Sequence, residues 1–203
     1  LVAGGSINVV DGVVLDHGGT ITIREAVTGG SIEMTSDGAG ANGIFAGTTN
    51  AVLTATNGGI VLDATVGGVN FGSGTLIAAG TVDLDAATTI SVANVTTTSG
   101  GDFTSNAGGT FSLVAGGSIH TSGDVIVNHG GTVTIAAGVI ADDTVSITSQ
   151  ASSANAILGN VAAASILGVN GVMLVASHSS GSVNFTAGSL AATTGNVNVQ
   201  AGN

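Results

Sequence analysis

A long internal repeat is the feature that most limits how this chain can fold. Residues 1–23 read LVAGGSINVVDGVVLDHGGTITI and residues 113–135 read LVAGGSIHTSGDVIVNHGGTVTI, so the two segments align without a gap at an offset of 112. The match continues at an offset of 113 for Ile44 and Ile157 and reaches 115 for Val82 and Val197. This drift predicts three single-residue additions at the turns of a periodic structure.

The repeat divides the chain into a first unit, residues 1–112, and a second, truncated unit, residues 113–203. The pattern is already in progress at Leu1 and is still in progress at Asn203. We therefore expect one continuous stretch of a longer array.

Within each copy, a glycine pair is followed by a small hydroxyl residue and then by alternating apolar and polar residues. Residues 18–23 (GGTITI) and 130–135 (GGTVTI) are examples. Alternation with a period of two in β-branched residues predicts short strands with one buried face. We expect the glycine pairs to supply positive φ angles at the corners between strands. The leading apolar residues, which we expect to point inward, are Ile7, Val14, Ile21, Ile32, Val69, Leu76, Val82, Ile90, Phe103, Phe111, Ile119, Val125 and Val133.

Strands this short, without a helical period between them, leave an antiparallel sandwich or a β-solenoid as the fold. The duplication favours the solenoid, because stacked coils require the same pattern of every coil. The sequence therefore predicts an all-β fold, a parallel β-helix with about three short strands per coil. At roughly 22 residues per coil, the repeat unit is about five coils that rise about 24 Å, and the whole chain is about nine coils. We expect Phe71 and Phe185 in the same core layer, and ladders of Asn and Thr side chains near the corners.

The composition narrows the possible partners. Hydrophobic residues make up 43% of the chain and charged residues only 6%, so we expect an ordered protein. A single Lys or Arg stands against 12 Asp and Glu, and the net charge of -11 should repel nucleic acid and acidic membrane surfaces. The chain has no cysteine for disulfides or thiolate metal sites. The one long apolar stretch, residues 154–176, matches the threonine-containing residues 41–63, so we expect strands in both and no membrane span.

Strands that begin at glycine, such as residues 80–85 (GTVDLD) and 195–200 (GNVNVQ), occur in a chain rich in Asn, Thr, Ser and Ala. This pattern resembles the shaft repeats of filamentous haemagglutinin-like exoproteins and related bacterial surface adhesins, and the likeness covers essentially the whole chain. The resemblance implies a right-handed parallel β-helix and export by a two-partner or autotransporter route. It also implies an extracellular location, as a fibre of the bacterial cell surface or matrix.

Acidic residues are the candidates for catalysis, because β-helices include polysaccharide lyases and hydrolases. A lyase needs cations near its base, and Arg24 is the only Lys or Arg of the chain, which argues against that mechanism. A hydrolase needs two carboxyl groups roughly 5 to 9.5 Å apart, and the candidate pairs are Asp142 with Asp143 and Asp83 with Asp85. We expect these residues to be solvated carboxylates that keep a fibre soluble, and we assign no catalytic residue and no cofactor site.

The four histidines are the candidate metal ligands. His17 and His129 occupy the same position of the repeat, so we expect them about 24 Å apart, too far to share a zinc ion. His120 and His178 replace other residue types of the first copy, so neither position demands an imidazole. We expect all four at corners and no metal site, since the glycine-rich calcium-binding nonapeptide and the EF-hand loop are also absent.

Two further patterns suggest surface roles. Threonine pairs of the kind found on ice-binding solenoids occur at Thr20/Thr22, Thr54/Thr56, Thr96/Thr98 and Thr132/Thr134. Ice binding would need such a pair on every coil of one face, and strand propensity explains them equally well. Asn94 and Asn184 begin glycosylation sequons.

The sequence therefore predicts a structural repeat segment of a secreted or cell-surface bacterial fibre or adhesin, and not an enzyme. Its expected partners are further repeats or chains, associated end to end, and a host or neighbouring cell surface. A carbohydrate-binding or ice-binding solenoid face is the alternative, followed by a β-helical polysaccharide hydrolase. Sugar binding usually uses exposed aromatic platforms, and the chain has no Trp or Tyr.

Overall fold

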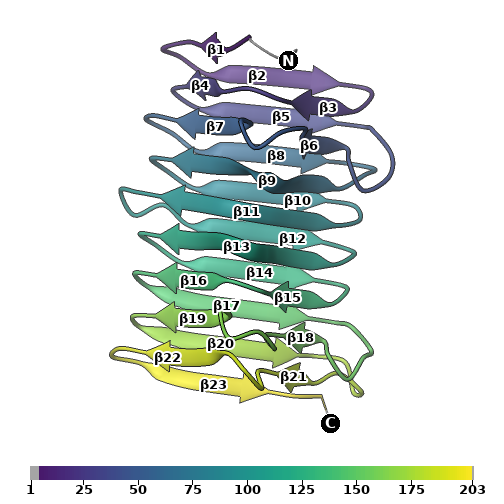
Figure 1. Ribbon diagram of the computed structural model, residues 1–203, viewed down its shortest axis with the longest axis vertical. Coiled ribbons are helices and arrows are strands. Elements are labelled where there is room, and N and C mark those ends of the chain that lie inside the picture. Colours follow the sequence, from purple (N-terminus) through teal and green to yellow (C-terminus); the bar gives the residue numbers. More distant parts are fainter. Residues whose placement is uncertain (1–4, 203) are drawn as a thin grey trace.

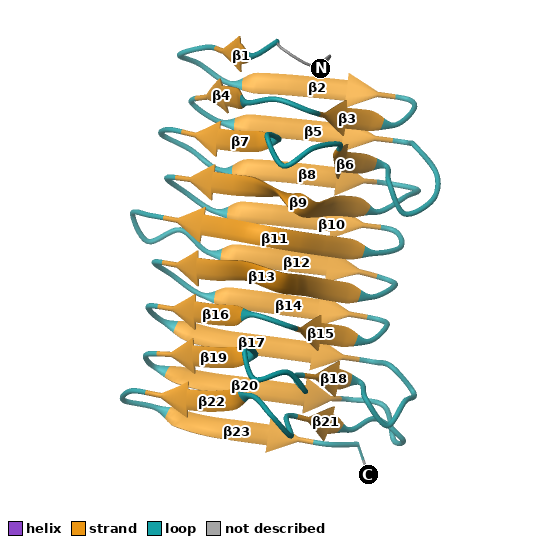
Figure 2. Cartoon of the chain, viewed as in Figure 1, coloured by secondary structure: helices purple, strands orange, loops and turns teal. Residues whose placement is uncertain are grey.

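The computed structural model describes residues 5–202, and these form 23 strands and no helix. The strands stack along one axis into an elongated β-solenoid of about nine coils, with β1 and β23 at its opposite ends (Figure 1, Figure 2). Paired strands run parallel in both sheets. The predicted fold class is confirmed.

One sheet, here called sheet B, contributes a single strand to each coil. Its nine strands are, in order, β2 (Val13–His17), β5 (Ile32–Ser36), β8 (Ile60–Ala64), β10 (Val82–Ala86), β12 (Phe103–Ala107), β14 (Val125–His129), β17 (Thr144–Ser149), β20 (Gly171–Ala176) and β23 (Asn196–Gln200). Residues paired between neighbouring strands are 19 to 28 positions apart in the chain, so the coils vary in length.

The 14-stranded sheet, here called sheet A, completes each coil. In three middle coils one long strand crosses it, and these strands are β9 (Val69–Ala78), β11 (Ile90–Thr97) and β13 (Phe111–Thr121). The shorter strands of the other coils are β1 (Ile7–Asn8), β3 (Ile21–Ile23), β4 (Val27–Gly29), β6 (Ile44–Ala46), β7 (Val52–Ala55), β15 (Val133–Ile135), β16 (Gly138–Ala141), β18 (Ile157–Leu158), β19 (Ser165–Gly168), β21 (Val183–Asn184) and β22 (Ser189–Ala192). The register of β11 shifts after Val92, which is where the short strands separate in other coils. In these middle coils the two short strands of sheet A are therefore joined into one long strand, so each of these coils has two strands instead of three.

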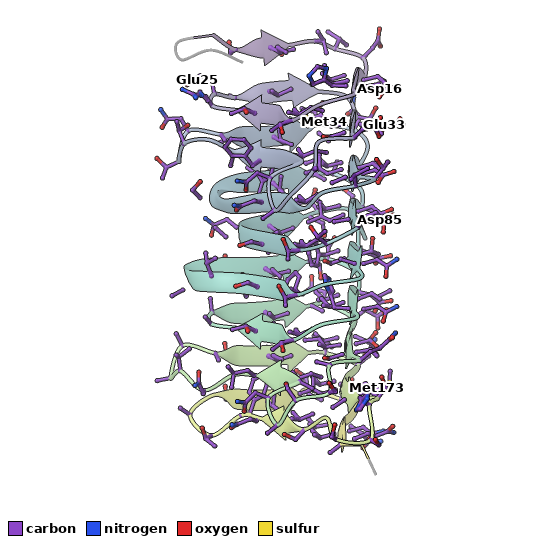
Figure 3. The ribbon with its side chains drawn as sticks, turned by 90° about the vertical axis from the view of Figure 1, so that its right-hand side faces the viewer. Asp16, Glu25, Glu33, Met34, Asp85 and Met173 are labelled. Atoms are coloured by element: carbon purple, nitrogen blue, oxygen red, sulfur yellow. The ribbon has the colours of Figure 1, made fainter. Side chains whose placement is uncertain are left out.

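A single apolar core runs between the two sheets along the solenoid. Strand alternation builds it: in β10, Val82 and Leu84 are fully buried while Asp83 and Asp85 face outward. Figure 3 shows the same alternation in the first coils, where Met34 lies inside and Glu33 outside. Because the two sheets cover the inward face of each strand, apolar residues at alternate positions suffice to form the core.

Phe71 and Phe185 pack against the core at equivalent places of the two copies, as predicted. Phe71 is fully buried, and Phe185, one of the last core residues, is partly buried. In the preceding coil, the residue stacked against each ring is small: Ala46 lies next to Phe71, and Gly159 lies next to Phe185. A Cβ atom on Gly159 would lie 2.3 Å from a ring carbon of Phe185, so the large and small residues compensate each other.

One predicted inward residue is wrong. Val14 is 73% exposed, and Val13, paired with the buried Ile32, points into the core instead. Two adjacent valines allow either register of the alternation, and the repeat matches Val14 with the outward-facing Ile126. The other residues of the predicted inward set belong to the core, except for Ile7 in β1, which is 36% exposed.

The expected role of the glycine pairs at corners is correct at Gly100, whose φ angle is +79°; Gly116 has the same φ angle but lies within β13. It is wrong for the pairs at 108–109 and 130–131, which do not have positive φ angles. At Gly109 and Gly130 the backbone of the adjacent coil leaves no room for a side chain. A Cβ atom on Gly109 would lie 1.9 Å from the Thr88 carbonyl oxygen. These glycines permit close stacking of corners.

The strand pairing in sheet B also corrects the predicted alignment of the two copies of the repeat. Strands β2 and β14 are five strands apart. Matched residues of the two copies are Val13 and Val125, Ile32 and Val145, Ile60 and Val172, and Val82 and Val197. Their offsets are 112, 113, 112 and 115, so the differences include one deletion and are not three single additions.

The residues described by the structure include no helix that is long and apolar enough to cross a membrane. The apolar residues 154–176 form β18, β19 and β20, which are strands as expected.

Candidate functional site

The outward face of sheet B brings the candidate carboxylates Asp83 and Asp85 close to a third one, Asp63. Asp63 of β8 pairs in register with Asp85 of β10, so they lie one coil apart, about 4.8 Å between strands. Asp83 and Asp85 are two residues apart on β10 and face the same side. Burial raises the pKa of the Asp85 carboxyl, as do the charges of Asp83 and, more weakly, Asp63, whereas a hydrogen bond from Asn106 opposes the rise.

A shallow depression of about 440 Å³ lies where these strands end. Asp63, Asp85, Asn106 and Gln150 contribute polar side chains to its wall. These groups can exchange hydrogen bonds with a polar ligand, but the only Lys or Arg, Arg24, lies in the connection between β3 and β4. No group of three His, Cys, Asp or Glu side chains suited to a metal ion occurs in residues 5–202.

The spacing between Asp83 and Asp85 is compatible with a hydrolase, but the surroundings of the two residues are not. Residues two apart on a strand have Cα atoms about 6.6 Å apart, which is within the range for a pair of catalytic carboxyls. However, both side chains point the same way from an outer sheet face, and the Thr104 hydroxyl of the next coil donates a hydrogen bond to Asp83. A catalytic pair has to flank a sugar from two sides, which this arrangement does not do.

The second candidate pair, Asp142 and Asp143, is divided between two different partners. Asp143 accepts a hydrogen bond from the Asn170 side chain of the next coil at 2.8 Å. Asp142 lies 4.0 Å from the Nε2 atom of His120, and both side chains are more than half exposed. The carboxylates are therefore corner groups with separate contacts.

The four histidines occupy different environments, and the expected corner position is wrong for His120. His178 lies at a corner, as expected, where its Nδ1 atom is 3.0 Å from the Ser180 hydroxyl. His17 ends β2 and is exposed. His120, however, lies within β13 and not at a corner, and His129 is fully buried.

His129 forms a polar cluster inside the core. Its Nε2 atom is 3.0 Å from the Ser105 hydroxyl, its Nδ1 atom is 3.3 Å from the Gly109 carbonyl oxygen, and its ring centre is 5.4 Å from that of Phe111. A carbonyl oxygen only accepts, so Nδ1 carries the proton and Nε2 accepts from Ser105. Burial lowers the pKa of His129 to about 4, although the hydrogen bond to Gly109 opposes this. The alternation of β14, in which Val125 also points inward, was the sequence signal for this buried position.

Two aspartates that the sequence did not single out tie coils together. Asp102 and Asp124 each directly precede a sheet B strand. The Asp102 carboxylate accepts the backbone N–H of Asp124 at 2.8 Å, and Asp124 accepts the backbone N–H and the hydroxyl of Thr144 at 2.8 and 2.5 Å. Each carboxylate thus binds a backbone group of the next coil that would otherwise lack a partner.

Asparagine contacts recur in both copies of the repeat. The side-chain amide of Asn70 donates to Asn42 at 2.9 Å, and that of Asn184 donates to Asn155 at the same distance. Each copy thus has one asparagine pair between coils; Asn70 faces Ser91 in the following coil, so the predicted ladder does not continue past the pair. The sequon residue Asn184 therefore already uses its amide nitrogen between coils.

Among the predicted threonine pairs, Thr54 and Thr96 share an outward column of sheet A. Ile77 lies between them in that column, paired with both. Among the described coils, this column is therefore not a continuous row of threonines.

Comparison of the chain with protein-family models, with curated proteins and with solved structures found no match. The resemblance to filamentous haemagglutinin-like exoproteins therefore stays a prediction based on the repeat pattern.

Proposed function

We propose that this chain is a structural segment of an extracellular bacterial fibre or surface adhesin, and that it builds an elongated shaft without catalysing a reaction. The observation that carries the proposal is the recurrence of the same contacts five coils apart. The Asn70–Asn42 bond and the Asn184–Asn155 bond have equal lengths and equivalent places. When both copies of a repeat keep the same contacts between coils, the coils stack in the same way along the chain. Regular stacking of this kind is what an elongated shaft needs.

Buried serines support the same function. Ser36 and Ser149 end matched sheet B strands, are fully buried, and donate to the carbonyl oxygens of Gly19 and Gly131 at 2.7 and 2.8 Å. These hydrogen bonds satisfy groups inside the stacked corners and contribute to rigidity.

The distribution of charge favours a soluble rod. Asp16, Glu33 and Asp85 lie on the outer side of sheet B, and Figure 3 shows them along one side of the solenoid. Repulsion between such faces, within a net charge of -11, opposes lateral clumping of rods. Further repeats would extend the rod along its axis, and contact with a host or neighbouring cell would come from other parts of the array.

Immunogold labelling tests the location and the shape together. An antibody fragment against the outer face of sheet B, selected to require Asp83 and Asp85, should label intact cells or shed material at intervals along thin filaments. A strain carrying Asp83→Asn and Asp85→Asn should lose the label while it keeps the filaments, because both side chains are outside the core. Label confined to the cell interior, or to globular particles, would contradict the proposal.

An activity assay separates the fibre from the hydrolase. The purified chain should release no reducing sugar from pectin, polygalacturonate or xylan. Release that is abolished by Asp85→Asn, but not by the exposed Asp142→Asn, would instead assign catalysis to the depression beside Asp85.

A further inference from the structure

Asparagine followed directly by glycine occurs at three places in this chain, Asn42–Gly43, Asn57–Gly58 and Asn170–Gly171. Such a pair can close a ring, because a glycine without a Cβ atom lets its backbone nitrogen approach the carbonyl carbon of the asparagine side chain. The reaction needs an asparagine carbonyl that is open to attack and a backbone N–H that is not already used in a hydrogen bond. The three pairs differ in both respects.

Two of the pairs are held by hydrogen bonds between coils. The Gly58 N–H donates to the Gly30 carbonyl oxygen at 2.7 Å, so this nitrogen is already engaged. Gly171 begins β20, which pairs with both β17 and β23, and the Asn170 amide nitrogen donates to Asp143 at 2.8 Å. Attack at either pair would therefore require local opening of stacked coils.

The third pair, Asn42–Gly43, lies in the wide corner between β5 and β6, residues 37–43, which Figure 1 shows as a loop at the side of the solenoid. Within the described residues, the Gly43 N–H has no hydrogen-bond partner. Asn42 is exposed, and its side-chain oxygen accepts a hydrogen bond from the Asn70 amide at 2.9 Å. This donor polarises the carbonyl group at the oxygen on which negative charge develops during attack.

We propose that Asn42 is a site of spontaneous deamidation. The Gly43 nitrogen bonds to the Cγ atom of Asn42 and gives its proton to water. The bond from Cγ to the side-chain nitrogen then breaks, and ammonia leaves with a proton taken from water. Water opens the resulting succinimide ring at either carbonyl, which yields aspartate or isoaspartate. The net reaction consumes water and releases ammonia without any oxidation or reduction.

Both products change this corner of the solenoid. Either one places a carboxylate beside the Asn70 amide, which adds a negative charge to a chain whose net charge is already -11. Isoaspartate also routes the backbone through the former side chain, so the path into β6 becomes longer by the Cβ atom. A fold that is otherwise uniform along its axis thus has one corner that alters with age.

The second copy of the repeat provides a natural comparison. In the matching corner, residues 150–156, Asn155 accepts the same kind of hydrogen bond from Asn184, also at 2.9 Å. The next residue is Ala156, and its Cβ atom hinders ring closure. The two corners therefore share the asparagine contact and differ in the residue that supplies the attacking nitrogen.

Ageing of the purified chain at neutral pH, followed by peptide mapping and mass spectrometry, tests the proposal. In the folded chain Asn42 should deamidate severalfold faster than Asn57, Asn170 and Asn155. In concentrated urea, where the coils are unstacked, the three asparagine–glycine pairs should react at similar rates. A preference that exists only in the folded chain belongs to the structure and not to the local sequence.

Two variants test the named atoms. The double variant Gly43→Ala and Ala156→Gly should move the reaction from Asn42 to Asn155, because each corner then carries the residue of the other. Asn70→Ala should slow deamidation of Asn42 severalfold in the folded chain and leave its rate in urea unchanged. Circular dichroism checks that both variants are folded.

The proposal is overturned if Asn57 or Asn170 reacts as fast as Asn42 in the folded original chain, or if Asn42 reacts only in urea. A folded double variant that still reacts at Asn42 and not at Asn155 would also overturn it. An unchanged rate in folded Asn70→Ala would contradict the role of the Asn70 hydrogen bond. The fibre proposal does not depend on this reaction, so it stands whichever result is found.

Discussion

Replacing Gly109 by alanine should be among the most destabilising small changes in this protein. The new Cβ atom would lie 1.9 Å from the Thr88 carbonyl oxygen and 2.8 Å from its carbon. Ordinary contact would require the stacked backbones at this corner to separate by about 1.5 Å. Overpacking costs about 1 to 3 kcal/mol, and we expect about 3 kcal/mol because backbone must move.

Two other glycines serve as matched controls for close stacking. A Cβ atom on Gly138 would meet only the Ser165 hydroxyl at 3.4 Å, and Ala26 occupies the same position in the first copy. Gly138→Ala should therefore stay within about 0.5 kcal/mol of the original stability or slightly increase it. Gly116 has a φ of +79° and open space around it, so Gly116→Ala should cost about 1 to 2 kcal/mol through the backbone alone.

Thermal and urea unfolding, followed by far-ultraviolet circular dichroism, would rank the three variants. For a chain of this size, 3 kcal/mol corresponds to a fall in Tm of roughly 6 to 12 °C. Equal midpoints for Gly109→Ala and Gly138→Ala would refute the close-stacking explanation. A larger loss at Gly116 than at Gly109 would show that positive φ angles, and not stacked backbones, determine where this chain needs glycine.

Three further predictions compare buried with exposed side chains. Because burial lowers the pKa of His129 from 6.5 to about 4, the unfolded chain binds a proton in this window that the folded chain does not. Stability should thus fall by roughly 3 kcal/mol as the pH drops from 6.5 to 4, and His129→Leu should remove that part of the slope in urea titrations. Gly159→Val should lower Tm by clashing with Phe185, and adding Phe185→Ala should restore part of it; no recovery would argue against their contact. Val133→Asp should cost roughly 3 kcal/mol or more by burying a carboxylate, whereas Arg24→Ala should change stability by less than about 0.5 kcal/mol, and equal midpoints would contradict the assignment of inside and outside.

The sequence was sufficient for the fold because a solenoid needs only local alternation and a repeat. Each coil meets a coil of nearly the same pattern, so the buried residues could be predicted without knowing distant contacts. The prediction for Val14 was wrong for a local reason, since either of two adjacent valines satisfies the alternation. The prediction for the glycine pairs was wrong because it depended on another coil: the atom that excludes a Cβ on Gly109 belongs to Thr88 of the preceding coil.

The candidate site was harder to predict because its properties arise between coils. The sequence pointed to Asp83 and Asp85, but the contribution of Asp63 depends on the 22 positions that separate it from Asp85. Contacts of Asp102 with Asp124 likewise depend on the register between strands. The burial of His129 was not predicted, although the alternation of β14 places its side chain inward.

The unequal coil lengths have a mechanical consequence. Backbone hydrogen bonds between coils run along the long axis, so tension on the two ends of the rod loads the outermost coil first. A coil that peels away releases 19 to 28 residues, the spacing between paired sheet B residues. At about 3.5 Å per residue this is roughly 70 to 100 Å of slack, compared with about 4.8 Å of lost height. A stretched array would therefore yield in discrete steps of different size, absorbing work coil by coil while the rest of the shaft stays stiff.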